Sequence, residues 1–500
     1  MMTRESKYNM RRLIGYLRQF GRFQRNARLY LLQSAQVGIA IGLFMLLYPL
    51  YLSALGYKID LIGLVLFFTP LGTGVAIIPA GLCIDRFSGK AILIWSSVAI
   101  AIAGLGEILF RDLVLLCISA FVIGIGVSFQ YVLNAPFLTS NSMPDERPHL
   151  FSFNLVLILA TTVLGELLGG ALPVWLREHP QAMFPGLSWL LVSETLARSY
   201  QITLLCGVLI ALTSFLPLFL MTAYPLSHGR PEQQPFWHVL LFLRKLWHSL
   251  RNNFKKDTIT QRDATDSGAT LSFWQRLRLF LLSPLAVMAG SYVLGSFGTG
   301  MLYPYAGLFF VEHLESGSAL FSVISGSSNA MLAFATLLTP LMVMRIGRLK
   351  TIVFTSLLSV PVILCIGIFP FLLLVAILYP LFQVFWNMAN GILQLFGMEV
   401  VPQKLQGRAN SSYQIAAQGA STAATPIGGF LISRLGYTPV FWIVAVLLLS
   451  SSLLLWWRFA GKRFVTPEAN AVATESGQEE DERVVISSED AEQVKDVKRR

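Results

Sequence analysis

Apolar residues dominate this chain in long runs that are separated by short polar turns. A transmembrane helix needs about 20 consecutive apolar residues. Runs of that length fall near 29–54, 60–83, 91–110, 113–138, 149–175, 200–222, 279–309, 319–343, 350–369, 371–397, 408–433 and 438–458. None shows the alternation over about ten residues that is typical of a membrane β-barrel strand. The pattern therefore predicts an all-α polytopic membrane protein with about twelve transmembrane helices.

Composition strengthens this prediction. Hydrophobic residues make up 54% of the chain and charged residues 13%, whereas soluble domains carry about 25% charged residues. The cysteines lie inside apolar runs. We therefore expect them to be small core residues rather than disulfide partners or metal ligands. They are Cys83, Cys117, Cys206 and Cys365.

The distribution of basic residues predicts the orientation. Residues 1–28 carry eight Arg or Lys side chains against one Glu, and such segments stay on the cytoplasmic side. Twelve crossings then return the C-terminus to the same side, so both termini are expected in the cytoplasm and the protein in the cell membrane. The net charge of +11 is explained by bases beside the membrane spans, and no nucleic-acid partner is expected.

One turn between two apolar runs carries a recognisable motif. It reads Gly81-Leu-Cys-Ile-Asp85-Arg86-Phe-Ser-Gly89-Lys90. At Gly81, Asp85, Arg86 and Lys90 this sequence resembles the loop that follows the second helix in the major facilitator superfamily. By this resemblance Asp85 latches the two halves of the protein in the outward-open state, and the fold is two six-helix bundles that alternate about a central site. The competing interpretation is a plain turn that obeys the positive-inside rule.

The motif recurs later in the chain, where Met344 replaces its acid. The copy keeps Arg345, Gly347 and Arg348, and Arg345 follows Arg86 by 345 − 86 = 259 residues. Gly428 follows Gly169 by the same 428 − 169 = 259 residues. A parallel repeat of two six-helix halves is expected from these landmarks. Without the acid, the second copy is expected to gate differently from the first.

The repeat predicts a domain division. We expect a basic cytoplasmic N-terminus, a first bundle, a cytoplasmic linker with a basic amphipathic helix on the inner leaflet, a second bundle and a disordered cytoplasmic tail. The linker pattern also fits a calmodulin-like partner. The boundaries are 1–28, 29–222, 223–278, 279–461 and 462–500.

Two acids lie inside the apolar runs of the first half. Glu166 belongs to Gly165-Glu166-Leu-Leu-Gly169-Gly170, where drug/proton antiporters of the superfamily have Gly-Pro-x-x-Gly-Gly. Desolvation favours the neutral carboxyl, which suits a proton carrier. A Glu that is hydrogen-bonded to a neighbouring helix or that faces outer water is the alternative. Glu107 lies one turn from Arg111 and is interpreted as a structural ion pair.

Neutral polar side chains at membrane depth are the candidates for a substrate cavity. By resemblance, the first, fourth, seventh and tenth helices line that cavity, although each side chain could equally join two helices. These candidates are Gln33, Gln36, Tyr48, Gln130, Asn134, Tyr303, Asn387 and Asn390.

These residues predict a secondary transporter of small neutral or amphipathic solutes, working by alternating access, with proton-coupled export favoured. No catalytic residue, metal site or cofactor is expected, because the chain has no phosphate-binding loop and its histidines lack metal-ligand spacing. The partners are the lipid bilayer, a small-molecule substrate and protons, and a monomer is expected. Open alternatives are an uncoupled facilitator, sugar or nutrient uptake, a lipid scramblase, and a transport-silent sensor or assembly protein.

Overall fold

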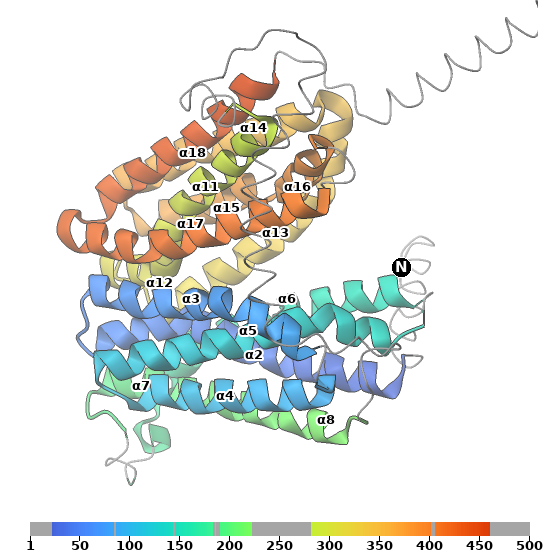
Figure 1. Ribbon diagram of the computed structural model, residues 1–500. Coiled ribbons are helices and arrows are strands. Elements are labelled where there is room, and N and C mark those ends of the chain that lie inside the picture. The colour runs from blue at the N-terminus through green and yellow to red at the C-terminus, as the bar shows by residue number, and fades with distance from the viewer. Residues whose placement is uncertain are drawn as a thin grey trace, which may run out of the picture. The chain divides into compact units, whose positions relative to one another are not determined.

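The computed structural model describes residues 23–84, 87–143, 146–183, 186, 191–222, 282–401 and 406–460. The basic N-terminal segment up to residue 22, the linker, the tail and the latch residues Asp85 and Arg86 lie outside these ranges. Within them the secondary structure is helical and no strand occurs. The fold-class prediction is therefore confirmed. The helices form two compact units (Figure 1), which comprise residues 1–51 with 65–281, and residues 52–64 with 282–500.

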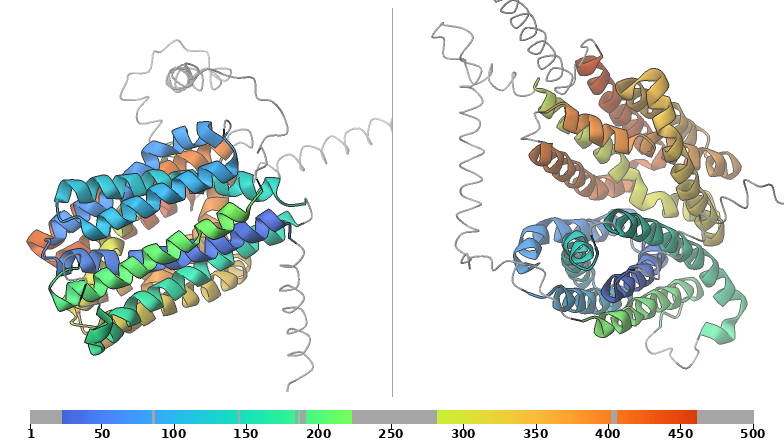
Figure 2. Two further views of the ribbon diagram at one scale, coloured as in Figure 1. Left: turned by 90° about the horizontal axis from the view of Figure 1, so that it is seen from below. Right: turned by 90° about the vertical axis from the view of Figure 1, so that its right-hand side faces the viewer.

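The first unit is a bundle of long helices that run alongside one another (Figure 2). Helix α4 packs against α5, α7 and α8, and α6 packs against α7. The helices are α2 (Arg25–Ala54), α3 (Ile59–Ile84, whose first residues belong to the second unit), α4 (Gly89–Leu109), α5 (Leu113–Ser140), α6 (Arg147–Glu178), η2 (Pro180–Met183), α7 (Thr195–Thr213) and α8 (Phe215–Leu220).

The second unit places α11 between α17 and α18, and α14 between α15 and α18 (Figure 1). Two of its membrane segments are interrupted, one after α11 and one between α15 and α16. The elements are α11 (Pro284–Leu302), η5 (Tyr303–Tyr305), α12 (Ala306–Leu308), the π-helix η6 (Phe309–His313), α13 (Ser318–Ile346), α14 (Arg348–Ile368), α15 (Leu372–Asn387), α16 (Asn390–Glu399), α17 (Gln406–Leu435) and α18 (Tyr437–Phe459).

Eleven helical segments among the described residues are long and apolar enough to cross a membrane. The one predicted run that is not among these eleven, near 408–433, corresponds to α17, which is long enough but rich in Ser, Thr, Gln and Ala. Small polar side chains suit a helix that contacts other helices rather than lipid. Helix α17 does so, because it packs closely on α11.

Glycines bring pairs of helices into backbone contact. A Cβ on Gly42 of α2 would lie 2.0 Å from the Thr162 carbonyl oxygen of α6, and a Cβ on Gly165 would lie 2.1 Å from the Ile39 carbonyl oxygen. Small residues allow such close crossings in membranes, where packing and interhelical contacts replace the hydrophobic driving force. Gly165 of α6 and Gly42 of α2 therefore allow the two helices to cross closely.

The second unit repeats this crossing. Gly300 of α11 follows Gly42 by 300 − 42 = 258 residues, close to the spacing of the sequence repeat. A Cβ on Gly300 would lie 2.6 Å from the Ser421 carbonyl oxygen of α17, and a Cβ on Gly428 would lie 2.5 Å from the Met301 carbonyl oxygen. The internal repeat is thus also a repeat of helix packing, with α2–α6 in one unit matched by α11–α17 in the other.

Candidate functional site

Tyrosine and amide side chains form a hydrogen-bonded network in the second unit. Asn387 Nδ2 donates to the Tyr303 hydroxyl at 3.0 Å and to Gln383 Oε1 at 3.1 Å. Gln383 Nε2 donates to the Tyr379 hydroxyl at 3.0 Å, and Asn390 Nδ2 donates to Asn387 Oδ1 at 3.1 Å. Three predicted cavity residues, Tyr303, Asn387 and Asn390, therefore meet around the Asn387 amide.

The network lies where two membrane helices are interrupted. Helix α15 ends at Asn387 and α16 begins at Asn390, while α11 gives way to the 3₁₀ turn that begins at Tyr303. At the first break, the Met388 carbonyl oxygen accepts a hydrogen bond from Thr339 Oγ1 at 3.1 Å. Irregular backbone at membrane depth is tolerated where protein buries it or where it lines a cavity, and broken helices mark binding sites in transporters.

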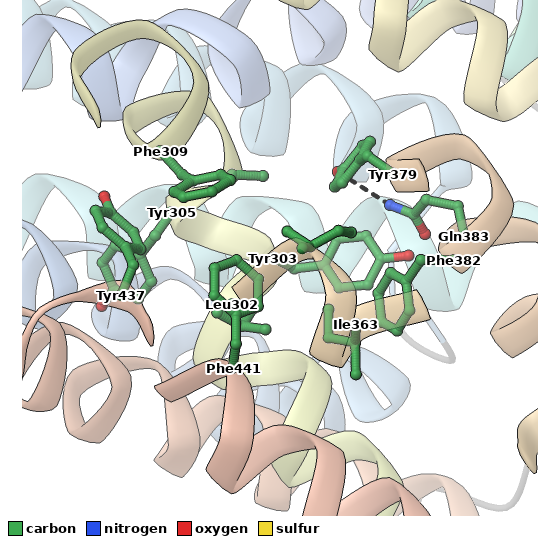
Figure 3. Close-up of a pocket in the computed structure, with 12 residues that line it drawn as sticks. Leu302, Tyr303, Tyr305, Phe309, Ile363, Tyr379, Phe382, Gln383, Tyr437 and Phe441 are labelled. Atoms are coloured by element: carbon green, nitrogen blue, oxygen red, sulfur yellow. Dashed lines mark hydrogen bonds between the residues drawn. The ribbon is translucent and has the colours of Figure 1, made fainter. Parts of the chain in front are cut away.

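The network also borders a pocket inside the second unit. Tyr303, Tyr379 and Gln383 lie in its wall, and Gln383 donates to Tyr379 there, as Figure 3 shows. Members of the network thus line a pocket whose lining is mainly aromatic and aliphatic.

Two of the glutamines predicted for the first half make separate bonds between helices. Gln36 Nε2 of α2 donates to Thr213 Oγ1 of α7, and Gln130 Nε2 of α5 donates to Ser97 Oγ of α4, both at 3.0 Å. Each bond joins two helices of the first unit. Joining helices is the alternative to a cavity role that the sequence left open for these side chains. The remaining amide candidates of this unit are the buried Gln33 and the half-buried Asn134.

Tyr48 lies next to Glu107, a buried acid of the first unit. Its buried hydroxyl lies beside the Glu107 carboxyl, which is 3% exposed. Arg111, the partner expected for Glu107, donates through Nη1 to the Tyr51 hydroxyl at 2.8 Å and to the Ile108 carbonyl oxygen at 3.0 Å. Tyr48 and Glu107 therefore form a buried polar pair between α2 and α4.

Glu166 lies directly after the α2–α6 crossing and is 8% exposed. A Cβ on Gly42 would lie 2.8 Å from the Glu166 backbone nitrogen. The backbone of Glu166 thus lies at this close crossing, and a shift of α6 against α2 would move it.

The described part of the first motif serves as a helix cap. Ser88 Oγ accepts a hydrogen bond from the Ala91 backbone nitrogen at the start of α4. Lys90 Nζ donates to the carbonyl oxygens of Phe219 at 2.9 Å and Met221 at 2.6 Å, at the end of α8. A cation at a helix C-terminus is stabilising, so Lys90 stabilises the contact between α4 and α8. Gly81 lies near the end of α3, where an added Cβ would meet no atom of another segment within 4 Å.

The second copy of the motif obtains an acid from elsewhere in the chain. Arg348, at the start of α14, forms an ion pair with Glu399 at the end of α16. Gly347 turns the chain between α13 and α14 with φ of +86°, a conformation that favours glycine. Arg345 lies exposed at the end of α13. The second copy of the motif thus has an acidic partner, Glu399, which pairs with Arg348.

We expect the Arg348–Glu399 pair to matter more for transport than for stability. Its side chains are 42% and 25% exposed, and exposed pairs contribute about 0–1 kcal/mol. Arg348→Glu and Glu399→Arg should each slow substrate flux while shifting the unfolding midpoint little, and the double reversal should restore the flux. Flux assays in vesicles with equal protein loading would measure this. Failure of the double reversal to recover flux would refute a gating role for the pair.

Sequence reasoning missed Tyr379, Gln383 and Glu399. Tyr379, Gln383 and Asn387 recur every four residues, so they share one face of α15. That spacing was the signal that could have identified the first two as members of the site. Glu399 carries no such signal, because its partner Arg348 is distant in the chain.

Metal binding has no support in the described ranges. No group of three or more His, Cys, Asp or Glu side chains is placed there to hold a metal ion. The four cysteines are free thiols.

The two helical units, the interrupted helices and the neutral polar network define a multi-pass membrane protein of the transporter class. The family model of the Major Facilitator Superfamily matches residues 31–425 and 292–494. The chain belongs to the major facilitator superfamily, as its sequence motif predicted. Its transporters act in the membrane on small-molecule substrates.

Solved structures agree on the fold. A bacterial homologue of the iron transporter ferroportin, in an inward-facing state, is 14% identical with a TM-score of 0.63, over 87% of this chain and 98% of that one. The nucleoside transporter NupG is 13% identical with a TM-score of 0.62, over 87% and 100%. The D-xylose-proton symporter is 14% identical with a TM-score of 0.58, over 86% and 97%. No curated protein matches the chain.

Proposed function

We propose that this protein is a secondary transporter that exports small organic solutes by alternating access, driven by protons. The observation that carries the proposal is the tyrosine and amide network at the two helix breaks. Its groups are neutral donors and acceptors, which suit a neutral or amphipathic solute with hydroxyl or amide groups. Broken membrane helices supply such sites in transporters.

Glu166 is the proposed proton carrier. A carboxyl that is buried in a membrane helix favours its neutral form, and the α2–α6 crossing ties its position to the packing of two helices. Protonation and deprotonation would then favour different arrangements of α6, which is what coupling to a conformational cycle requires. Glu107, beside Tyr48, provides a second buried acid for comparison.

The test uses proteoliposomes that contain a pH-sensitive dye, under an imposed pH gradient. The solute panel includes a pentose, a nucleoside, 5-aminolevulinic acid and amphipathic amides. The first three are chosen because solved structures with a similar fold include a D-xylose-proton symporter, a nucleoside transporter and a transporter in complex with 5-aminolevulinic acid. Wild type should show proton flux that depends on one of these solutes. Glu166→Gln should abolish that flux and leave counterflow of the solute intact, because exchange needs no net proton movement.

Glu107→Gln is the matched control, since it neutralises another buried acid of the same unit. Proton flux that persists in Glu107→Gln and vanishes in Glu166→Gln would support the proposed carrier. The reverse result would assign the proton to Glu107. Solute movement without any proton signal in wild type would leave an uncoupled facilitator.

The sensor hypothesis is tested at Asp85, which lies outside the described residues. Asp85→Asn should slow turnover if the motif works as a latch. A folded variant that transports at the wild-type rate would count against the latch.

A further inference from the structure

Helix α17 exposes two faces of different chemistry. Gln414 and Gln418 are both exposed, and because they are four residues apart they share one face of the helix. Ala423, Ile427 and Phe430 are also exposed, but their positions place them on another face. An amide without a partner in hydrocarbon is costly, whereas apolar side chains are not. The apolar face therefore suits lipid, and the face of the two glutamines suits water or a polar solute.

The two glutamine amides are available to a ligand. Among the described residues, the side chains of Gln414 and Gln418 form no hydrogen bond. One turn nearer the start of α17 the situation differs, because Asn410 Oδ1 accepts from Gln394 Nε2 of α16 at 3.2 Å. That pair of amides is used between helices, while the next two amides along α17 are not.

The register of α16 and α17 brings the free amides level with the polar network. The two helices pack against each other (Figure 1), and they run antiparallel because consecutive membrane crossings alternate in direction. Their register is given by the bond between Gln394 and Asn410. One turn along each helix from this bond, Asn390 and Gln414 lie at about the same level. The next turn brings Gln418 to about the level at which α15 ends.

The chemistry of this face indicates an uncharged ligand. No charged residue occurs between Asn410 and Ser433, so α17 offers no counter-ion at this depth. A glutamine amide both donates and accepts hydrogen bonds, which matches the hydroxyl and amide groups of a solute. The network beside it consists of groups of the same kind, from Tyr303, Asn387 and Asn390.

We propose that Gln414 and Gln418 bind the solute from α17, beside Asn390 and Asn387, and that this solute is uncharged and carries several hydroxyl or amide groups. The inference rests on the proposed function, because it adds contacts and a chemical class to the same site. A solute with a single polar end would leave part of these amides without a partner, which costs binding.

The first test is cysteine labelling of the full-length protein in detergent, in a background whose native cysteines are replaced by alanine. A charged, hydrophilic thiol reagent should label Gln414→Cys and Gln418→Cys, because both positions face water. It should not label Phe430→Cys, which is 52% exposed on the apolar face of the same helix. Labelling of Gln418→Cys that is no faster than that of Phe430→Cys would overturn the proposal.

Protection by solutes then tests the contact and the chemical class. D-xylose, adenosine and nicotinamide represent uncharged solutes with hydroxyl or amide groups. At least one of them should slow the labelling of Gln418→Cys severalfold and leave Glu312→Cys, an exposed position in η6, unaffected. 5-Aminolevulinic acid, which carries both charges at neutral pH, should give no protection. Protection by 5-aminolevulinic acid alone, or by none of the four, would refute the proposed class.

Flux in vesicles separates this inference from the proposed function. Gln418→Leu should raise the half-saturation concentration of the transported solute about three- to tenfold, as expected for one or two lost neutral hydrogen bonds. Gln394→Leu is the matched control, since its amide bonds to Asn410, and it should behave like wild type. A raised value in Asn387→Leu with a wild-type value in Gln418→Leu would remove α17 from the site and keep the network. Wild-type values in both variants would contradict the network as well.

Discussion

Gly42→Ala is expected to destabilise the protein severely, although alanine is the better helix former. In an open helix, glycine to alanine gains up to about 1 kcal/mol. Here the new Cβ would lie 2.0 Å from the Thr162 carbonyl oxygen and 3.0 Å from the Gly165 Cα. Both are backbone atoms, so α2 and α6 must separate as whole helices. Overpacking costs about 1–3 kcal/mol and occasionally more, and a rigid backbone clash belongs at the upper end of that range.

Thermal unfolding in detergent measures this effect, with Gly74→Ala as the matched control. Gly74 lies inside α3 with nothing within 4 Å of its added Cβ, so its variant should be neutral or slightly stabilised. The repeat supplies a second pair, in which Gly300→Ala should destabilise and Gly419→Ala should not, since Gly419 is also open. Equal midpoints for Gly42→Ala and Gly74→Ala would show that the α2–α6 crossing is looser than described.

The helices could be predicted closely from the sequence because the bilayer imposes their length and polarity. The run near 113–138 became α5 at Leu113–Ser140, for example. The interruptions could not be predicted. Tyr303-Pro304-Tyr305 and Asn387 to Asn390 lie within long apolar runs. Pro304 lacks the backbone N–H that a continuous helix uses, but Pro49 lies inside α2 without ending it, so proline alone does not mark a break. At the second break the Met388 carbonyl oxygen accepts a hydrogen bond from Thr339 of another helix.

The roles of single polar residues were harder to predict than their depth. Gln36 and Asn387 both read as amides at membrane depth, yet Gln36 bonds to Thr213 of a neighbouring helix whereas Asn387 joins four other polar groups. Whether an amide makes one bond to a neighbouring helix or joins a larger network depends on the side chains of the facing helix. Those side chains can be far away in the chain. The distance between Gln36 and Thr213 is 177 residues.

The proposed proton carrier and the polar network belong to different units of the chain. Glu166 lies in the first, and Asn387 in the second. A proton and a solute are coupled when each favours one state of the same conformational equilibrium, so direct contact between them is unnecessary. Variants of the network should therefore alter solute affinity first and leave the acid's own protonation intact.

Asn387→Leu is expected to lower transport about tenfold or more while the protein still folds. Asn387 Nδ2 donates to Tyr303 and Gln383, and its Oδ1 accepts from Asn390. Leucine has a similar size but leaves these polar groups without their partner, and each unsatisfied group costs about 1–3 kcal/mol if buried. A loss of 1.4 kcal/mol in solute binding is already about tenfold in affinity.

The measurement is the concentration dependence of solute flux in vesicles, with the amount of folded protein checked by size-exclusion chromatography. Gln394→Leu is the matched control, because Gln394 donates to Asn410 at 3.2 Å outside the network and its loss should leave flux nearly unchanged. Tyr303→Phe should fall between the two, since it removes one hydroxyl and keeps the ring. Half-saturation should rise more than the maximal rate falls, because the network acts on binding. If Asn387→Leu and Gln394→Leu transport equally well, Asn387 joins helices as Gln36 does, and the solute binds elsewhere.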